Sequence, residues 1–173
     1  MSKKRILVID DEEHVRQSMA SLLELEGYHV DTAKTGAEAV EKSKSNFYNL
    51  ALIDIRLPDM EGTKLLTAMP NTVPKMAKII LTGYPTLNSA IEAVNTGADG
   101  YVTKPITDLD NFLQKIREHL RKQEESEQYA EEKIADFLKT RLEHLETKES
   151  KVSNSTKSRE NEEDRTGYDW SRF

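Results

Sequence analysis

The sequence predicts an α/β fold with a parallel sheet of five strands that is covered by helices on both faces. Up to about residue 120, short apolar runs alternate five times with segments whose apolar residues recur every three or four positions. The runs at residues 6–9 and 50–53 contain no polar residue, which is typical of strands buried on both faces. Alternation of such strands with helices favours a doubly wound sheet.

The predicted elements follow one another in strict alternation. We expect strands at residues 6–9, 28–32, 50–53, 78–81 and 100–103. We expect helices at residues 15–25, 36–44, 65–69, 87–94 and from about 108 to 120. Gly27 and Gly97 follow two of these helices. Glycine commonly ends a helix because it adopts a left-handed backbone conformation without strain.

The composition limits the class of protein. The 173 residues suffice for one domain and an appendage. The net charge is −6 with both signs spread along the chain, whereas a nucleic-acid-binding face is basic and clustered. The absence of cysteine excludes disulfides, thiolate catalysis and cysteine-ligated zinc. Residues 1–5 lead directly into a strand without a secretory signal, and no apolar stretch approaches the roughly 20 residues of a membrane span. We therefore expect a cytoplasmic protein.

Polar side chains follow four of the predicted strands. Asp10 and Asp11 come after the first strand, Asp54 after the third, Thr82 after the fourth and Lys104 after the fifth. In open parallel sheets, ligands bind outside the carboxyl ends of the strands. The four segments therefore bring three acids, a hydroxyl and a lysine to one edge of the sheet.

The residue types at this edge favour phosphoryl chemistry. Three carboxylates stay ionised together when a divalent cation lies between them, and an all-oxygen set favours Mg²⁺, with Mn²⁺ as the alternative. A carboxylate can act as the nucleophile that forms an aspartyl phosphate. Lys104 would balance the charge of the phosphoryl oxygens, and Thr82 would donate a hydrogen bond to one of them.

Each of these residues alone has an ordinary explanation. A single Asp after a strand commonly caps a helix or forms a turn, and a lone Thr or Lys at a strand end is commonly solvated. Independent turn residues are not expected to supply the whole set at matching strand ends. The joint pattern therefore favours a site.

The strand-end motifs resemble the receiver domain of two-component response regulators, over residues 4–120. They are Asp10-Asp11, Ile53-Asp54 followed by Pro58 and Gly62, Leu81-Thr82-Gly83, and Lys104-Pro105. The resemblance implies the flavodoxin-like strand order 2-1-3-4-5 of the chemotaxis regulators.

The resemblance also implies a role for each site residue. Asp54 would be the phosphoacceptor. Mg²⁺ would be bound by Asp11, Asp54 and the backbone carbonyl of Arg56, and Asp10 would act through a metal-bound water. Thr82 would move toward the phosphoryl group, and Lys104 would pair with it.

Three further roles follow from the resemblance. Tyr101 would be the switch aromatic that turns inward when Thr82 moves, and the peptide bond before Pro105 would be cis. Arg56 and Tyr84 would flank the path of the attacking water. Since both are large, we hypothesise that they slow self-dephosphorylation.

We divide the chain into a receiver domain at 1–122, a helical extension at 123–149 and a disordered tail at 150–173. In the extension, apolar residues continue at helical spacing, after polar residues at 123–128 that indicate either a solvated stretch or a break. The stripe is interpreted as a coiled-coil, dimer or partner seam, or as a surface helix packed on its own domain. Ser, Asn, Glu and Lys dominate after residue 150 and favour disorder. The aromatic end at 168–173 is either a docking peptide or has no role.

These features predict a receiver that is phosphorylated by a histidine kinase and is not itself an enzyme. Its output would be a change in protein–protein contacts through the face of residues 87–97, 100–103 and 108–120, and through the tail. No DNA-binding output domain is expected, since residues 121–173 hold 11 Lys or Arg against 14 Asp or Glu and no second core. The alternatives are a phosphoryl shuttle or sink in a multistep relay, and an adaptor that works without phosphorylation.

Overall fold

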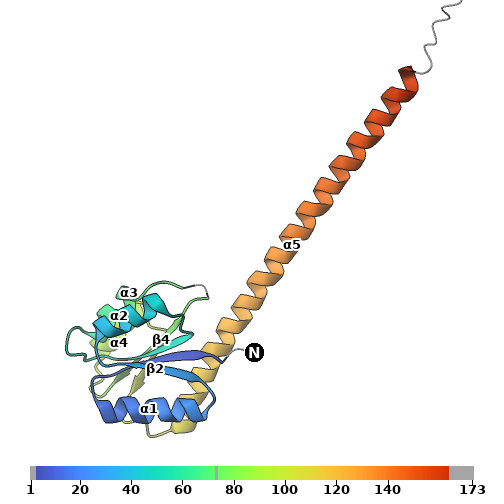
Figure 1. Ribbon diagram of the computed structural model, residues 1–173. Helices are drawn as coiled ribbons and strands as arrows, with labels where there is room; N and C mark the ends of the chain where they lie inside the picture. Colours follow the sequence, from blue (N-terminus) through green and yellow to red (C-terminus); the bar gives the residue numbers. More distant parts are fainter. Residues whose placement is uncertain (1–2, 73, 164–173) are drawn as a thin grey trace, which may run out of the picture. The chain divides into compact units, whose positions relative to one another are not determined.

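The computed structural model describes residues 3–72 and 74–163 of the chain, and side chains as far as residue 143. Strands and helices alternate throughout (Figure 1). In order they are β1 (Arg5–Ile9), α1 (Glu13–Leu25), β2 (His29–Ala33), α2 (Gly36–Ser45), β3 (Leu50–Asp54), α3 (Gly62–Ala68), β4 (Ala77–Thr82), α4 (Leu87–Asn95), β5 (Gly100–Thr103) and α5 (Leu109–Glu163). Every predicted element is present with boundaries shifted by a few residues, except that the last helix continues to Glu163.

The five strands form one parallel sheet in the order β2-β1-β3-β4-β5, which confirms the predicted topology. Helices α1 and the first part of α5 cover one face, and α2, α3 and α4 cover the other (Figure 1). Successive side chains of a strand point to opposite faces. Ile6 and Val8 of β1 accordingly pack against α1 and α5, while Leu7 and Ile9 pack on the other face.

Burial on both faces explains why β1 has no polar residue after Arg5 and β3 has none before Asp54. All five residues of β3 are buried, as are the last four of β1. Each buried apolar side chain contributes about 1.5–3 kcal/mol, so a polar residue inside either strand would be costly. In these two strands, polar side chains are therefore confined to the ends.

Helix α5 is continuous through residues 123–128, where the sequence allowed either a solvated stretch or a break. Gln123, expected in a solvated stretch or a break, is only 7% exposed. Its amide accepts a hydrogen bond from Asn49 and donates to the backbone oxygen of Lys75, at 2.8 and 2.7 Å. This polar residue therefore does not interrupt the helix, because its side chain is hydrogen-bonded inside the domain.

The chain divides into two compact units, Met1–Glu127 and Gln128–Phe173. In the second unit, the large apolar side chains of the predicted stripe are exposed, and these are Tyr129, Ile134, Phe137, Leu138 and Leu142. The helix continues to Glu163, whereas the composition predicts disorder from residue 150. Residues 106–166 contain neither Gly nor Pro to interrupt a helix. The aromatic cluster at 168–173 lies outside the described residues, and the three-part division of the chain stays a prediction.

Candidate functional site

The carboxyl ends of four strands meet at one edge of the sheet and carry the predicted polar residues. Asp10 follows β1, Asp54 and Thr82 are the last residues of β3 and β4, and Lys104 follows β5. Because β1, β3 and β4 are neighbours, their ends lie side by side. One carboxylate oxygen from each of Asp10, Asp11 and Asp54 lies within 4.8 Å of the others. The sequence-predicted cluster is therefore present.

Lys104 lies between two of the three carboxylates. Its Nζ is 2.9 Å from Oδ2 of Asp10 and 3.2 Å from Oδ1 of Asp54. Burial disfavours the charged ammonium, but the hydrogen bond to Asp10 and the attraction of Asp54 outweigh it and raise the pKa of Lys104. The lysine is therefore a fixed positive charge at the site.

Burial and the ion pair with Lys104 shift the pKa of Asp54 in opposite directions. Asp54 is 7% exposed. Burial raises the pKa of its carboxyl, the nearby charges of Asp10 and Asp11 raise it further, and Lys104 counteracts only part of the shift. A further positive charge among the three acids would favour the ionised form of Asp54.

The three carboxylates fit an oxygen-ligated divalent cation. Asp11 is exposed, so its oxygens are available to a ligand. Both oxygens of buried Asp10 are already engaged, one by Lys104 and the other by the backbone amide of Glu12 at 2.9 Å. This division favours Asp11 and Asp54 over Asp10 as direct ligands of Mg²⁺.

Arg16 is a site residue that sequence reasoning missed. Its guanidinium donates hydrogen bonds to the backbone oxygens of Asp10 and Asp11, at 2.8 and 3.3 Å. It thereby adds a positive charge and fixes the turn between β1 and α1. Its position in the first turns of the helix that follows the acids was a usable signal.

Thr82 ends β4, and Tyr84 and Arg56 lie on the loops that follow β4 and β3 at this edge. Thr82 is fully buried, and its Oγ1 accepts a hydrogen bond from the backbone amide of Tyr84 at 3.1 Å. The guanidinium carbon of Arg56 lies 4.1 Å from the centroid of the Tyr84 ring. The two residues predicted to tune the phosphoryl lifetime are thus in contact.

Tyr101 on β5 is partly buried, and its hydroxyl lies 2.8 Å from the hydroxyl of Ser89 on α4. This hydrogen bond joins the predicted switch residue to α4. The peptide bond between Lys104 and Pro105 is cis, as the resemblance implied.

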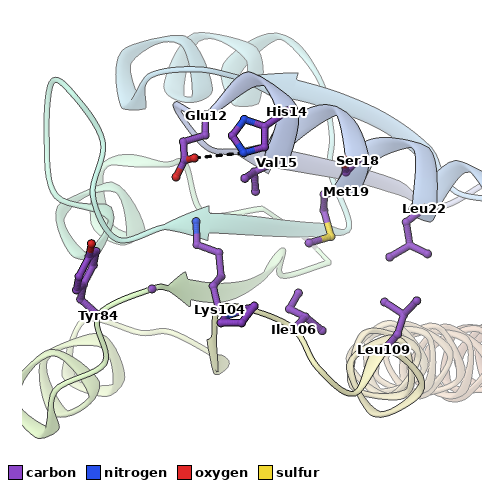
Figure 2. A pocket seen from close by; sticks show the side chains of 12 residues that line it. Glu12, His14, Val15, Ser18, Met19, Leu22, Tyr84, Lys104, Ile106 and Leu109 are labelled. Atoms are coloured by element: carbon purple, nitrogen blue, oxygen red, sulfur yellow. Dashed lines mark ion pairs between the residues drawn. The ribbon is translucent and has the colours of Figure 1, made fainter.

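A cavity of about 640 Å³ lies beside the site, between α1 and the start of α5 (Figure 2). Val15, Met19 and Leu22 from α1 face Ile106 and Leu109 across it. Lys104, Gly83 and Tyr84 line its end nearest the carboxylates, and Glu12 and His14 form an ion pair at its rim. The cavity is apolar inside and charged at its mouth.

Comparison with known proteins assigns the domain to a family. The sequence profile of the response regulator receiver domain matches residues 6–117, which contain all five strands except Arg5 and the whole carboxylate cluster. The chain belongs to this family. It is therefore a receiver domain of two-component signalling with a long helical extension.

Solved receiver structures share the fold. A receiver domain protein resembling the chemotaxis regulator CheY, from Methanospirillum hungatei JF-1, is 45% identical with a TM-score of 0.68, over 72% of this chain and 99% of that one. A response regulator from Burkholderia pseudomallei, solved with a phosphorylated aspartic acid, a calcium ion and citrate, is 28% identical with a TM-score of 0.60, over 72% of this chain and 73% of that one.

The curated relatives are longer than the matched segment. The transcriptional regulatory protein YkoG of Bacillus subtilis is 32% identical over 121 residues, which are 70% of this chain and 53% of YkoG. The chain thus spans about half the length of this relative. Among the residues that the structure describes, no helix combines the length and apolar content that a membrane crossing requires.

Proposed function

We propose that this receiver domain accepts a phosphoryl group on Asp54 from a histidine kinase and signals through altered protein–protein contacts. The main support is the ion pair that Lys104 forms with both Asp10 and Asp54, beside the exposed carboxylate of Asp11. The similar Burkholderia regulator contains a phosphorylated aspartic acid, and this supports phosphorylation of an aspartate in the present chain.

The transfer step needs a nucleophile and a means of holding negative charge. An oxygen of Asp54 attacks the phosphorus of the phosphohistidine, the P–O bond forms, and the P–N bond breaks as its electron pair returns to the imidazole. Lys104 lies 3.2 Å from that carboxylate and stabilises the phosphoryl oxygens as charge develops. The hydroxyl oxygen of Thr82 accepts a hydrogen bond from the Tyr84 amide, and its hydrogen would be donated to a phosphoryl oxygen.

Mg²⁺ is the cofactor that the donor set fits best, and Mn²⁺ is the alternative. Asp11, Asp54 and the backbone carbonyl of Arg56 would hold it, with Asp10 acting through water because both its oxygens are engaged. When bound, the ion supplies positive charge that keeps Asp54 ionised and stabilises the phosphoryl oxygens.

The kinase docks at the cavity between α1 and α5 in this proposal. A phosphohistidine must approach Asp54, and the cavity opens beside Lys104 and Tyr84 at that end of the sheet. Its apolar walls suit an apolar helix face of the kinase. Ser18 is an exposed residue of its wall, so a large side chain there would block docking without disturbing the core.

The output follows from two exposed surfaces. Tyr101 is hydrogen-bonded to Ser89, so movement of Tyr101 with Thr82 would release α4, whose exposed face carries Leu87, Ile91 and Val94. The exposed stripe of the extension, Ile134 to Leu142, offers a second surface for a partner or for a second copy of the chain. Phosphorylation would change contacts at the first surface.

The test separates the chemistry from the docking. Wild type and Asp54→Asn are incubated with Mg²⁺ and acetyl phosphate, and mass spectrometry and sizing chromatography follow phosphorylation and assembly. We expect wild type alone to gain one phosphoryl group, and equal labelling of Asp54→Asn would refute the acceptor assignment. With the cognate kinase, Ser18→Arg should be labelled at least tenfold more slowly than wild type, yet normally by acetyl phosphate. Gln17→Arg, an exposed neighbour that does not line the cavity, is the matched control.

A further inference from the structure

The loop between β3 and α3 is a closed hairpin that begins at the proposed phosphoacceptor. Arg56 forms an isolated bridge with Glu61. The amide of Leu57 donates to the oxygen of Met60 at 3.3 Å, and the amide of Gly62 donates to the oxygen of Ile55 at 2.8 Å. A displacement at the tip of this hairpin would therefore move Arg56 at its base.

Glycine makes the base of the hairpin possible. A Cβ on Gly62 would lie 2.3 Å from the backbone oxygen of Asp54. Because backbone atoms cannot withdraw as a flexible side chain can, no other residue fits without moving the strand end. The hairpin is thus packed directly on the backbone that carries the acceptor.

The tip of the hairpin is attached to a different helix by one side chain. The carboxylate of Asp59 accepts hydrogen bonds from the backbone amides of Gly36 and Ala37, at 2.9 and 2.8 Å. These amides belong to the first turn of α2, where they have no partner within the helix. The two hydrogen bonds also lower the pKa of Asp59.

A local cap already serves the same helix end. Thr35 accepts a hydrogen bond from the amide of Glu38 through its side chain, at 3.1 Å. Asp59 lies 22 and 23 positions away from the residues that it binds, and it is exposed. Capping of α2 alone does not require so remote a carboxylate, whereas attachment of the loop does.

We propose that Asp59 is a positioning residue for the metal site: by binding the first turn of α2, it holds the β3–α3 hairpin and so fixes Arg56 relative to Asp54. The inference rests on the proposed function, in which the Arg56 carbonyl is a ligand of Mg²⁺. Outer groups that orient metal ligands typically change metal affinity by about 10–100-fold when they are removed.

The test compares four forms of the full chain, namely wild type, Asp59→Ala, Asp59→Asn and Thr35→Ala. Titration calorimetry at fixed ionic strength gives the Kd for Mg²⁺, and amide hydrogen exchange reports the attachment of the loop. Asp59→Ala should raise the Kd about tenfold and speed exchange at Gly36, Ala37 and Gly62. Asp59→Asn keeps one acceptor oxygen and should lie between. Thr35→Ala should speed exchange at Glu38 and change the Kd less than twofold.

Three results would overturn the inference while wild type binds Mg²⁺. The first is an unchanged Kd in Asp59→Ala. The second is an equal rise in Thr35→Ala, which would assign the effect to the stability of α2. The third is an equal rise in Asp59→Asn and Asp59→Ala, which would assign it to the lost charge. Failure of wild type to bind Mg²⁺ is a different result and would overturn the proposed metal site together with this inference.

Discussion

Arg56 is stacked on Tyr84, with 4.1 Å between the guanidinium carbon and the centroid of the ring. The two residues come from loops that follow different strands, β3 and β4, and both are exposed. Each holds the other in place through a cation–π contact, which is worth about 0.5–1 kcal/mol at an exposed position. We therefore expect the pair to shield the phosphorylated site as one unit.

The lifetime of the phosphoryl group should show this coupling. Arg56→Ala and Tyr84→Ala should each speed loss of the phosphoryl group by about fivefold, equivalent to about 1 kcal/mol. The double variant should lose its phosphoryl group little faster than either single variant, because each substitution already disrupts the stacked pair. The decay is followed by mass spectrometry after acetyl phosphate is removed.

A second cation–π pair, in the helical extension, serves as the control for the loss of such a contact. Lys133 lies 5.5 Å from the ring centroid of Tyr129 in the helical extension, so Tyr129→Ala should leave the decay rate unchanged. Fully multiplicative effects of the two site substitutions would show that Arg56 and Tyr84 act independently.

Lys104 should have opposite effects on the metal and on phosphorylation. Its ammonium lies 3.2 Å from Asp54 and repels a cation bound to the same carboxylate. Lys104→Met should therefore tighten Mg²⁺ binding by roughly threefold to tenfold, as expected for about 1 kcal/mol of repulsion. Labelling by acetyl phosphate should slow by about 10²-fold, because a group that stabilises the transferred charge is lost.

Calorimetry and mass spectrometry measure the two effects on the same samples. The exposed Lys64 on α3 provides a control, and Lys64→Met should change neither quantity by more than twofold. Weaker Mg²⁺ binding in Lys104→Met would mean that the lysine organises the carboxylates more than it repels the ion.

The sequence predicted the site because each of its main residues carries a local signal. Asp10, Asp54 and Thr82 each follow an uninterrupted apolar run, and the sheet topology then brings the run ends together. The signal is lost where the partner comes from a distant segment with no pattern of its own. Asp59 resembles an ordinary turn residue until α2 is placed beside it.

The helical extension shows the same limit. Gln123 interrupts an apolar stripe and therefore favoured a solvated stretch or a break. Its partner Asn49 lies 74 positions away, and no periodicity links the two. Composition likewise favoured disorder after residue 150, because it reports the ability to form a core and not the local hydrogen bonding that forms a helix.

Tyr48 should make folding sensitive to alkaline pH. Its ring is 1% exposed, and burial together with the hydrogen bond to Asp31 raises the pKa of its hydroxyl to about 12. The ordinary value in the unfolded chain is about 10. The folded state therefore holds this proton longer, so the contribution to stability is complete below pH 10 and is lost as the pH rises toward 12.

The expected loss is about 2–3 kcal/mol of unfolding free energy across that range. Ultraviolet absorbance of tyrosinate should show a titration step near pH 12 that is missing in Tyr48→Phe and retained in both Tyr28→Phe and Tyr129→Phe. Urea unfolding of Tyr48→Phe should decline less steeply than wild type between the two pH limits. If the late step persists in Tyr48→Phe, another tyrosine is responsible for it.

Gln123 should stabilise the domain through its buried amide. It bonds to the side chain of Asn49 and to the backbone oxygens of Asn49 and Lys75, and every residue at positions 124–126 is exposed. Gln123→Ala leaves the Asn49 amide and two backbone oxygens without this partner and should cost about 1–3 kcal/mol of unfolding free energy. Glu125→Ala on the exposed side of the same helix should change it by less than about 0.5 kcal/mol.

A double-mutant cycle separates the amide pair from the loss of packing. Asn49→Ala alone also loses the hydrogen bond that its Oδ1 accepts from the Arg5 amide, so its cost should equal or exceed that of Gln123→Ala. Once Asn49 is Ala, Gln123→Ala should cost at least about 0.5 kcal/mol less than in wild type, because residues in one hydrogen-bond network are coupled. Urea unfolding measures all four forms, and strictly additive losses would show that the hydrogen bond between the two side chains does not contribute to stability.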